Sequence, residues 1–95
     1  MLPREVASKL KKGEPLTIVD VRESYEWISG HIPGAKHIPL GQIPERLGEL
    51  DPKKETIVVC MSGGRSSRAC EYLSHLGYKV INMKGGMSAW TGDIE

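Results

Sequence analysis

The sequence lacks several features that would indicate a secreted, membrane-bound or metal-binding protein. Only two of its 95 residues are cysteines, and no apolar run is long enough to cross a bilayer. Residues 1–15 lack the continuous apolar core of a signal peptide, so we expect a cytoplasmic protein with free thiols. The three scattered histidines do not have the spacing of zinc ligands, which predicts that no metal is bound.

The sequence also has no large excess of positive or negative charge. Thirteen lysines and arginines against twelve aspartates and glutamates give a net charge of +1. Such a balance produces no large field to attract nucleic acid or an anionic membrane surface, and we expect neither as a partner. Any binding of anions must therefore be local.

The length and composition fit one small globular domain spanning residues 1–95. Hydrophobic residues make up 39% of the chain and charged residues 26%, and no internal repeat or low-complexity tract interrupts this mixture. A chain of this size can bury one core without a disulfide or a metal ion.

Short apolar segments alternate between strand-like and helix-like patterns. Continuous, largely β-branched runs predict buried strands at 16–21 and 55–60, and shorter strands are expected at 35–38 and 78–82. Apolar runs of this kind are typical of a parallel sheet covered on both sides. We therefore expect an α/β fold, with helices packed on each face of a small parallel sheet.

Helical spacing of apolar residues appears between the predicted strands. Helices are expected from Pro3 until the stop at Gly13, over about 23–29, across the triplet Ile43, Leu47 and Leu50, and after the glycine-rich turn at 61–64. The last of these helices places four residues on its buried face and ends at Gly77. The four are Ala69, Cys70, Leu73 and Leu76.

Cys60 stands at the carboxyl end of the strand predicted over 55–60. A free cysteine is most often a small buried apolar side chain, and that interpretation needs no reactivity. Its position favours another role, because unpaired N–H groups and the positive end of a helix dipole lie at a strand-to-helix junction. Open parallel sheets also bind ligands beyond the carboxyl ends of their strands.

The residues behind Cys60 suit an anion cradle. Gly63 and Gly64 allow the chain to curl until successive N–H groups converge on one point. Arg65 adds a permanent charge with a planar fork of donors. We therefore expect the pKa of the Cys60 thiol to lie well below the free-thiol value of about 8.5, which would make it a nucleophile at neutral pH. The remaining members of the predicted binding loop are Met61, Ser62 and Ser66.

The segment "CMSGGRS" resembles the C-x-x-G-x-R-S active-site loop of the rhodaneses. Three further segments, "VDVRE" at 19–23, "GHIPGA" at 30–35 and "GGMSAW" at 85–90, resemble rhodanese signatures in the same order. The resemblance covers nearly the whole chain and implies a rhodanese-like fold, with a parallel sheet of four to five strands flanked by helices on both faces. The sequence before residue 16 leaves little room for the family's usual first strand.

The resemblance implies a sulfurtransferase that works by a ping-pong reaction. Cys60 would take a sulfane sulfur from an anionic donor such as thiosulfate, hold it as a persulfide, and pass it to cyanide, a thiol or an acceptor protein. No cofactor is needed for this chemistry. Arg65 would orient the anionic donor or hold the loop, while Asp20 and Arg22 would support the site through a salt bridge or hydrogen bonds.

Three other functions remain open on the same fold. The chain could be a persulfide carrier for a protein partner or a regulatory rhodanese-like module, although inactive modules typically lose the cysteine. A rhodanese-fold phosphatase or arsenate reductase is the third alternative. The phosphatase loop is C-x-x-x-x-x-R, one residue longer than the spacing from Cys60 to Arg65, which opposes that assignment.

Several conspicuous side chains are expected to be structural. His31 beside a Pro-Gly turn is expected to be a hydrogen-bonded structural histidine, since an ionised thiol needs no general base. Trp90 and Tyr25 could edge a pocket but are expected to pack. Cys70 is expected in the core, too far along its helix from Cys60 to form a disulfide.

Overall fold

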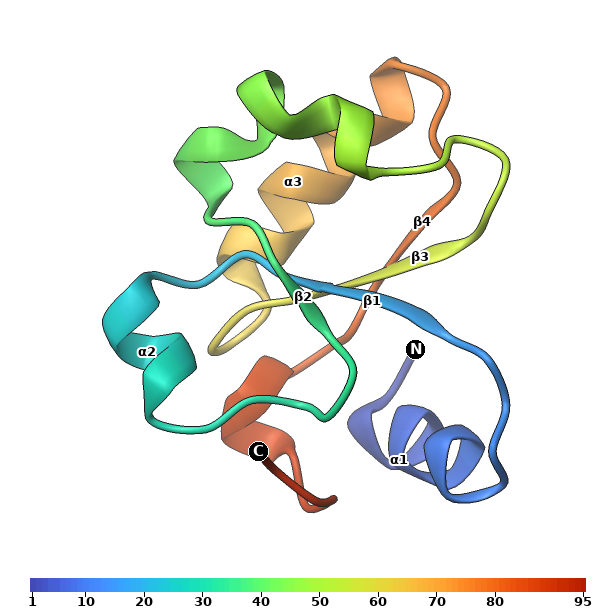
Figure 1. Ribbon diagram of the computed structural model, residues 1–95, viewed down its shortest axis with the longest axis vertical. Helices are drawn as coiled ribbons and strands as arrows, with labels where there is room; N and C mark the ends of the chain where they lie inside the picture. The colour runs from blue at the N-terminus through green and yellow to red at the C-terminus, as the bar shows by residue number, and fades with distance from the viewer.

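Four short segments pair into one parallel sheet that lies at the centre of the molecule (Figure 1). The computed structural model describes residues 1–95. The strands lie in the order β2, β1, β3, β4, and every neighbouring pair is parallel. Their bounds are β1 Thr17–Asp20, β2 Lys36–His37, β3 Thr56–Val59 and β4 Val80–Asn82.

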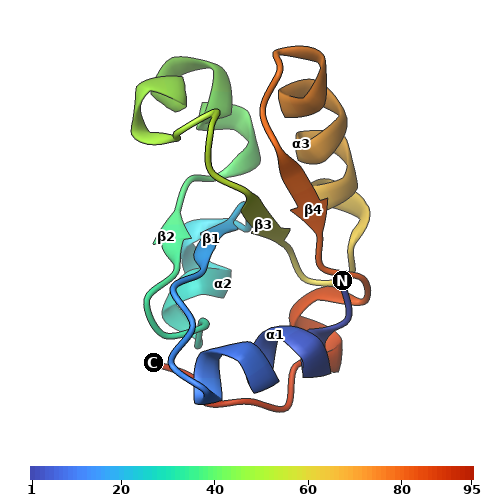
Figure 2. The same cartoon turned by 90° about the vertical axis from the view of Figure 1, so that its right-hand side faces the viewer.

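Helices cover both faces of this sheet (Figure 2). The α-helices are α1 Pro3–Lys11, α2 Ser24–Ile28 and α3 Gly64–His75, and the 3-10 helices are η1 Leu40–Glu49 and η2 Gly86–Ala89. α3 and η1 lie on one face, α1 and η2 lie on the other, and α2 lies beside the carboxyl ends of the strands. None of these helices combines the length and the apolar character needed to cross a membrane.

The strands bury side chains alternately on the two faces. In β3, Val58 belongs to the core cluster under α3 and η1, whereas Ile57 and Val59 belong to the cluster under α1. Cys60 continues this alternation and lies on the α3 side, with only 1% of its surface exposed. The expected α/β architecture, with a four-stranded parallel sheet and helices on both faces, is confirmed.

The segment predicted as a helix through Leu50 is a kinked 3-10 helix instead. It spans Leu40–Glu49, and the backbone leaves helical values at Arg46, where φ is −119°. Pro44 has no N–H to donate to a preceding carbonyl, which disfavours a regular α-helix here. Leu50 falls outside the helix yet is buried in the core. The apolar spacing therefore predicted the burial of Leu50 correctly but not the type of helix.

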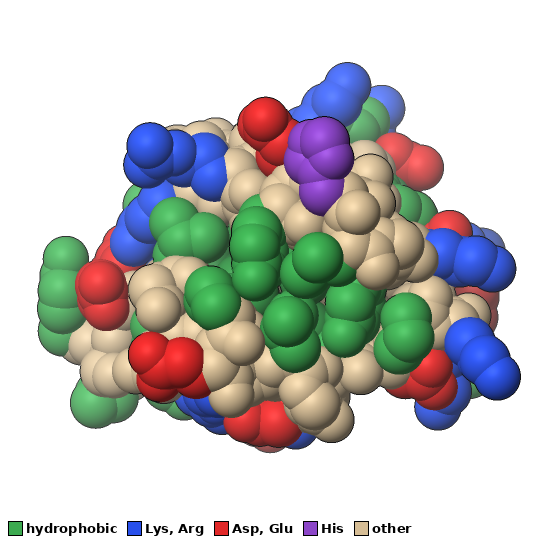
Figure 3. Space-filling model, turned by 90° about the horizontal axis from the view of Figure 1, so that it is seen from above, with side chains coloured by type: hydrophobic (Ala, Val, Ile, Leu, Met, Phe, Trp, Pro, Cys, Tyr) green, Lys and Arg blue, Asp and Glu red, His purple; other side chains and the backbone are tan.

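The buried face of α3 differs from the predicted one at its end. Ser66, Ala69 and Leu73 are buried and Cys70 is half-buried, but Leu76 is 48% exposed, so its predicted burial is wrong. Apolar side chains on the surface gather over η1 and the end of α3, as the view from above shows (Figure 3).

A Schellman motif explains why Leu76 turns outward. α3 ends at His75, and Gly77 takes a left-handed φ of 89°. The N–H of Tyr78 then donates to the carbonyl of Leu73 over 3.0 Å, which reverses the chain before Leu76 can pack on the sheet. Gly77 therefore has its predicted role as the helix stop.

Met1 lies along the outer edge of β4. The amino group of Met1 donates to the carbonyl of Asn82 over 3.0 Å, and the N–H of Lys84 donates to the carbonyl of Met1 over 2.9 Å. These two bonds cover the outer edge of β4 at one point.

The end of α3 predicts unequal effects for Leu73, which lies in the helix, and Leu76, which follows its last residue. Leu73→Ala should lower the free energy of unfolding by about 2–5 kcal/mol, because it empties a core position. Leu76→Ala should lower it by less than about 1 kcal/mol, because that side chain is largely solvated. Urea unfolding of both variants tests the assignment, and equal losses would contradict it.

Candidate active site

The loop after β3 wraps around the sulfur of Cys60. The N–H of Gly63 donates to Cys60 Sγ over 2.9 Å, and the hydroxyl of Ser66 lies 3.3 Å from the same atom. The carboxyl end of β3 supplies the thiol and the first turn of α3 supplies Ser66. The structure therefore brings these three residues of the predicted loop together around one atom.

Only one of the two loop glycines uses a conformation reserved for glycine. Gly63 has a φ of 105°, in the left-handed region, and it is the residue that turns its N–H toward the sulfur. Gly64 is the first residue of α3 and has no positive φ, which corrects the expectation that both glycines curl the loop. The Gly63 carbonyl accepts from Ser67 N–H over 3.0 Å and so starts the helix.

Opposing effects act on the ionisation of Cys60. Burial disfavours the thiolate, but hydrogen bonds from the Ser66 hydroxyl and from the N–H groups of Ser66, Gly63 and Ser62 outweigh it. The net result lowers the pKa of the Cys60 thiol below its ordinary value. The donors are neutral groups fixed by the fold, and they stabilise charge on sulfur without a metal or a general base.

The second cysteine has the opposite character. Burial raises the pKa of the Cys70 thiol to about 11, and its side chain packs against the core cluster on the α3 face. Both cysteines are free thiols. The pKa values of the two thiols are therefore shifted in opposite directions.

Arg65 is held by a carboxylate that the sequence did not indicate. Its two terminal nitrogens donate to Glu26 over 2.6 and 2.8 Å, and the Glu26 side chain is only 10% exposed. The hydrogen bonds from Arg65 lower the pKa of Glu26 to about 2, and the carboxylate in turn raises the pKa of Arg65. This bidentate pair joins the start of α3 to α2.

Asn82 is a second neighbour of the loop that the sequence did not single out. It ends β4, the strand beside β3, and its side-chain oxygen accepts a hydrogen bond from the Ser66 hydroxyl. Its side-chain nitrogen donates to the Gly63 carbonyl over 3.4 Å. The sequence did contain a signal for Asn82, since it is a polar residue at the carboxyl end of a predicted strand. Parallel strands end at the same edge of the sheet, so such a residue is expected near Cys60.

Asp20 and Arg22 form a buried salt bridge, with both side chains at most 3% exposed. Arg22 Nε lies 3.0 and 2.9 Å from the two carboxylate oxygens of Asp20. Another nitrogen of Arg22 donates to the carbonyl of Gly30 over 2.8 Å. The pair therefore ties the end of β1 to the segment that follows α2, and its hydrogen bonds do not reach Cys60.

The first residues of η2 hold the backbone of the loop. Met87 N–H donates to the Cys60 carbonyl over 2.8 Å, and Ser88 N–H donates to the Met61 carbonyl over 2.9 Å. A Cβ atom on Gly86 would lie 2.3 Å from the Cys60 carbonyl oxygen. Only glycine allows this approach, which explains the second glycine of the "GGMSAW" segment.

A hollow of about 450 Å³ opens beside the loop. The Met61 side chain lines it, together with Arg22, Tyr25, Glu26 and Trp90. Tyr25 is 73% exposed, so the expectation that it packs in the interior is wrong. Met87 and Ile94 extend the apolar part of this wall.

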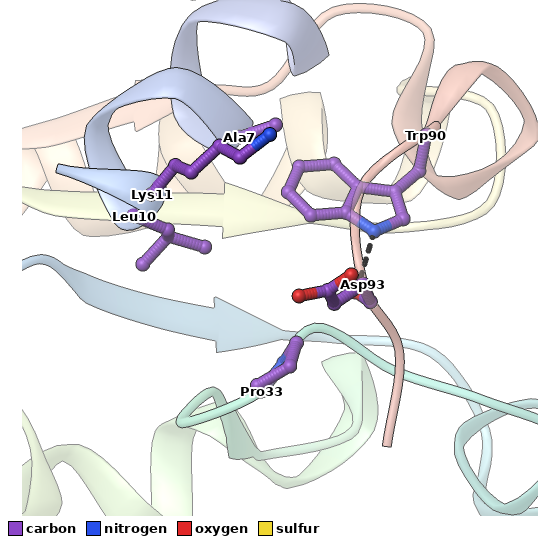
Figure 4. A pocket seen from close by; sticks show the side chains of 6 residues that line it. All are labelled: Ala7, Leu10, Lys11, Pro33, Trp90 and Asp93. Atoms are coloured by element: carbon purple, nitrogen blue, oxygen red, sulfur yellow. Dashed lines mark hydrogen bonds between the residues drawn. The ribbon is translucent and has the colours of Figure 1, made fainter. Parts of the chain in front are cut away.

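A second hollow of about 360 Å³ lies between α1 and the C-terminal segment (Figure 4). Trp90 lines it as well and donates from its indole nitrogen to the carbonyl of Asp93 over 3.0 Å. Leu10 and Pro33 form other parts of its wall, and no cysteine or histidine lines it. The indole of Trp90 thus contributes to two hollows, of which only the first reaches the Cys60 loop.

Two of the three histidines make structural contacts. His31 Nδ1 lies 3.0 Å from the Trp27 carbonyl, and its ring stacks on the indole with centroids 3.6 Å apart. His37 stacks on the same indole at 4.8 Å, and its Nε2 lies 2.7 Å from the Arg22 carbonyl. No three side chains of His, Cys, Asp or Glu lie close enough to share a metal ion.

Known proteins resemble this chain over nearly its full length. The family description "Rhodanese-like domain" matches residues 2–93. YtwF of Bacillus subtilis is 46% identical over 92% of this chain and 84% of its own length. A Pseudomonas putida protein named thiosulfate sulfurtransferase GlpE is 33% identical over 94% of this chain and 82% of its own length.

A solved structure shares the fold as well. The crystal structure of a rhodanese-like domain protein from Staphylococcus aureus aligns with a TM-score of 0.94 at 38% identity, covering 100% of this chain and 94% of that one. The sequence match and the fold match agree along the whole chain. The protein therefore belongs to the rhodanese-like domain family.

Proposed function

We propose that the protein is a sulfurtransferase that carries sulfane sulfur on Cys60. The observation that supports this most directly is the buried sulfur held by the Gly63 N–H and the Ser66 hydroxyl at the end of β3. A relative named as a thiosulfate sulfurtransferase, 33% identical over most of the chain, supports the same activity. The proposed donor is a small anionic sulfur compound such as thiosulfate, and the proposed acceptor is cyanide, a thiol or a protein.

The proposed reaction has two displacements at sulfur. The Cys60 thiolate attacks the outer sulfur of thiosulfate, the S–S bond of the donor breaks, and sulfite leaves with the electron pair. Cys60 then carries an anionic persulfide. Cyanide or a thiolate attacks its outer sulfur, and the Cys60 thiolate leaves unchanged, so that no external oxidant is consumed.

The loop supplies the electrostatic part of this mechanism. Neutral N–H groups that already point at Cys60 stabilise negative charge on sulfur in both half-reactions, with little reorganisation between them. Both terminal nitrogens of Arg65 are bound to Glu26, so the proposed role of Arg65 is first to hold the loop. In this proposal Glu26 cancels only part of the positive charge of Arg65, and the remaining positive field attracts an anionic donor.

A persulfide carrier that delivers sulfur to a protein is a second candidate. The hollow next to the loop favours it, because Tyr25, Met61 and Trp90 give its wall an apolar character. A small anion such as thiosulfate gains no binding energy from an apolar surface, whereas a protein acceptor would bury that surface on binding. Both candidates share the Cys60 persulfide and differ only in the acceptor.

The Cys60→Ser variant tests the proposed chemistry. Wild type incubated with thiosulfate should gain one sulfur atom on the peptide that contains Cys60, and it should form thiocyanate from cyanide. The variant should lose both signals, while Cys70→Ser should retain them. Mass spectrometry and thiocyanate assay measure the two steps separately. Absence of added sulfur on wild type, with thiosulfate and with a persulfide donor, would refute the proposal.

The two thiols should titrate on opposite sides of the free-thiol value. In the Cys70→Ser variant, the thiolate absorbance should rise with a midpoint below that of an ordinary free cysteine, because hydrogen bonds stabilise ionised Cys60. In Cys60→Ser the midpoint should lie near 11, because burial disfavours ionised Cys70. A Cys60 midpoint at or above the free-thiol value would be inconsistent with an activated nucleophile.

The Glu26–Arg65 pair predicts a stability difference that depends on pH. The pKa of Glu26 is lowered from 4.5 to about 2, so its contribution is complete above pH 4.5 and disappears as the pH falls toward 2. Glu26→Gln should therefore reduce the urea midpoint at pH 7 and match wild type near pH 2. Glu71→Gln, an exposed charge on α3 outside any salt bridge, is the control and should change little at either pH.

A constant difference between Glu26→Gln and wild type across this pH range would show that the pair does not contribute through its charge. A reduced midpoint for Glu71→Gln of similar size would point to a general charge effect. The comparison separates the bidentate pair from the net charge of the chain.

A further inference from the structure

We propose that Asn82 is a positioning residue for Cys60: its side-chain oxygen and the Cys60 sulfur are alternative acceptors for the single proton of the Ser66 hydroxyl. The side chain of Asn82 thereby controls how much of that hydrogen bond reaches the sulfur. The role of Cys60 as a nucleophile rests on the proposed function, but the competition for the proton does not.

The competition follows from the surroundings of Ser66. Its side chain is fully buried, with no exposed surface, so water does not share in its hydrogen bonding. Three acceptors surround the hydroxyl: Cys60 Sγ at 3.3 Å, the Gly63 carbonyl at 3.2 Å, and the Asn82 side-chain oxygen, which makes the shortest contact. A hydroxyl has one proton to donate, so a strong bond to one acceptor weakens the others.

The orientation of Asn82 is fixed by the same network. Its side-chain nitrogen donates to the Gly63 carbonyl over 3.4 Å, which turns the amide oxygen toward Ser66. Asn82 is the last residue of β4 and its backbone pairs in register with Val58, in the last residue pair between β3 and β4. Asn82 therefore presents an acceptor from a rigid element and not from a loop.

The two acceptors suit two states of the sulfur. A thiolate is a charged acceptor and draws the Ser66 proton, because hydrogen bonds to charged groups are stronger than bonds to neutral ones. In the proposed persulfide, the negative charge resides mainly on the outer sulfur, and the inner sulfur of Cys60 becomes a weak acceptor. Asn82 then accepts the bond, so the buried hydroxyl is never left without a partner.

Titration of the Cys60 thiolate in a Cys70→Ser background tests the proposal. Asn82→Ala removes the competing acceptor, so the acid ionisation constant of Cys60 should increase by about fivefold, the value of one neutral hydrogen bond. Asn82→Leu should act in the same direction and fills the space of the lost amide. Asn82→Asp should decrease the constant, because a carboxylate captures the proton and repels the thiolate.

The Ser66→Ala background separates this mechanism from a structural effect. Without the hydroxyl, Asn82→Ala should leave the ionisation constant of Cys60 unchanged, and Asn82→Asp should retain only its charge effect. Ser67→Ala, an exposed serine on the same helical turn, is the matched control and should preserve the response to Asn82→Ala. Circular dichroism and thermal melting establish that each variant is folded.

Two results would overturn the proposal. The first is an ionisation constant of Cys60 that decreases or stays constant in both Asn82→Ala and Asn82→Leu. The second is an equal increase in the presence and in the absence of the Ser66 hydroxyl. The titration needs no sulfur donor, so a negative thiosulfate assay would reject the proposed function and leave this inference standing.

Discussion

The hydrogen bond from the Gly63 N–H to the Cys60 sulfur is the constraint on which the site depends. It requires a left-handed Gly63, so that the chain turns back over the end of β3 immediately before α3 begins. It also requires that the end of β3 be fixed by η2, which can approach the Cys60 carbonyl because Gly86 has no side chain. A fixed strand end and a glycine turn together position donors that a flexible loop would leave to solvent.

Neutral donors, rather than free cations, offset the charge at this site. Arg65 is paired with Glu26, and Arg22 is paired with Asp20, so each arginine near the loop has its own carboxylate. The charge of a thiolate or persulfide therefore meets preorganised N–H and O–H dipoles. Such dipoles act at short range and are poorly screened by salt, which suits a buried sulfur. The net charge of the whole chain has little influence on this arrangement.

Local patterns in the sequence predicted the strands, the position of Cys60 at a strand end and the loop around it. They worked because β-branched runs and glycine turns are determined by neighbouring residues. Contacts between distant segments escaped them: Glu26 lies 39 residues from Arg65, and Asn82 lies 16 residues from Ser66. The exposure of Leu76 was missed because it depends on where the helix ends, and spacing alone does not determine that.

The position of α2 links the charge of the site to the shape of its entrance. This helix has no buried residue, so it is not held by an apolar core. Glu26 fastens it to α3 through Arg65, and the Trp27 indole stacks with His31 and with His37. Tyr25 on the same helix lines the hollow beside the loop. One ion pair thus fixes both the charge near Cys60 and the wall of the hollow beside which an acceptor approaches. A substitution of Arg65 therefore alters both together. Its effect on activity reflects the position of α2 as much as the binding of an anion.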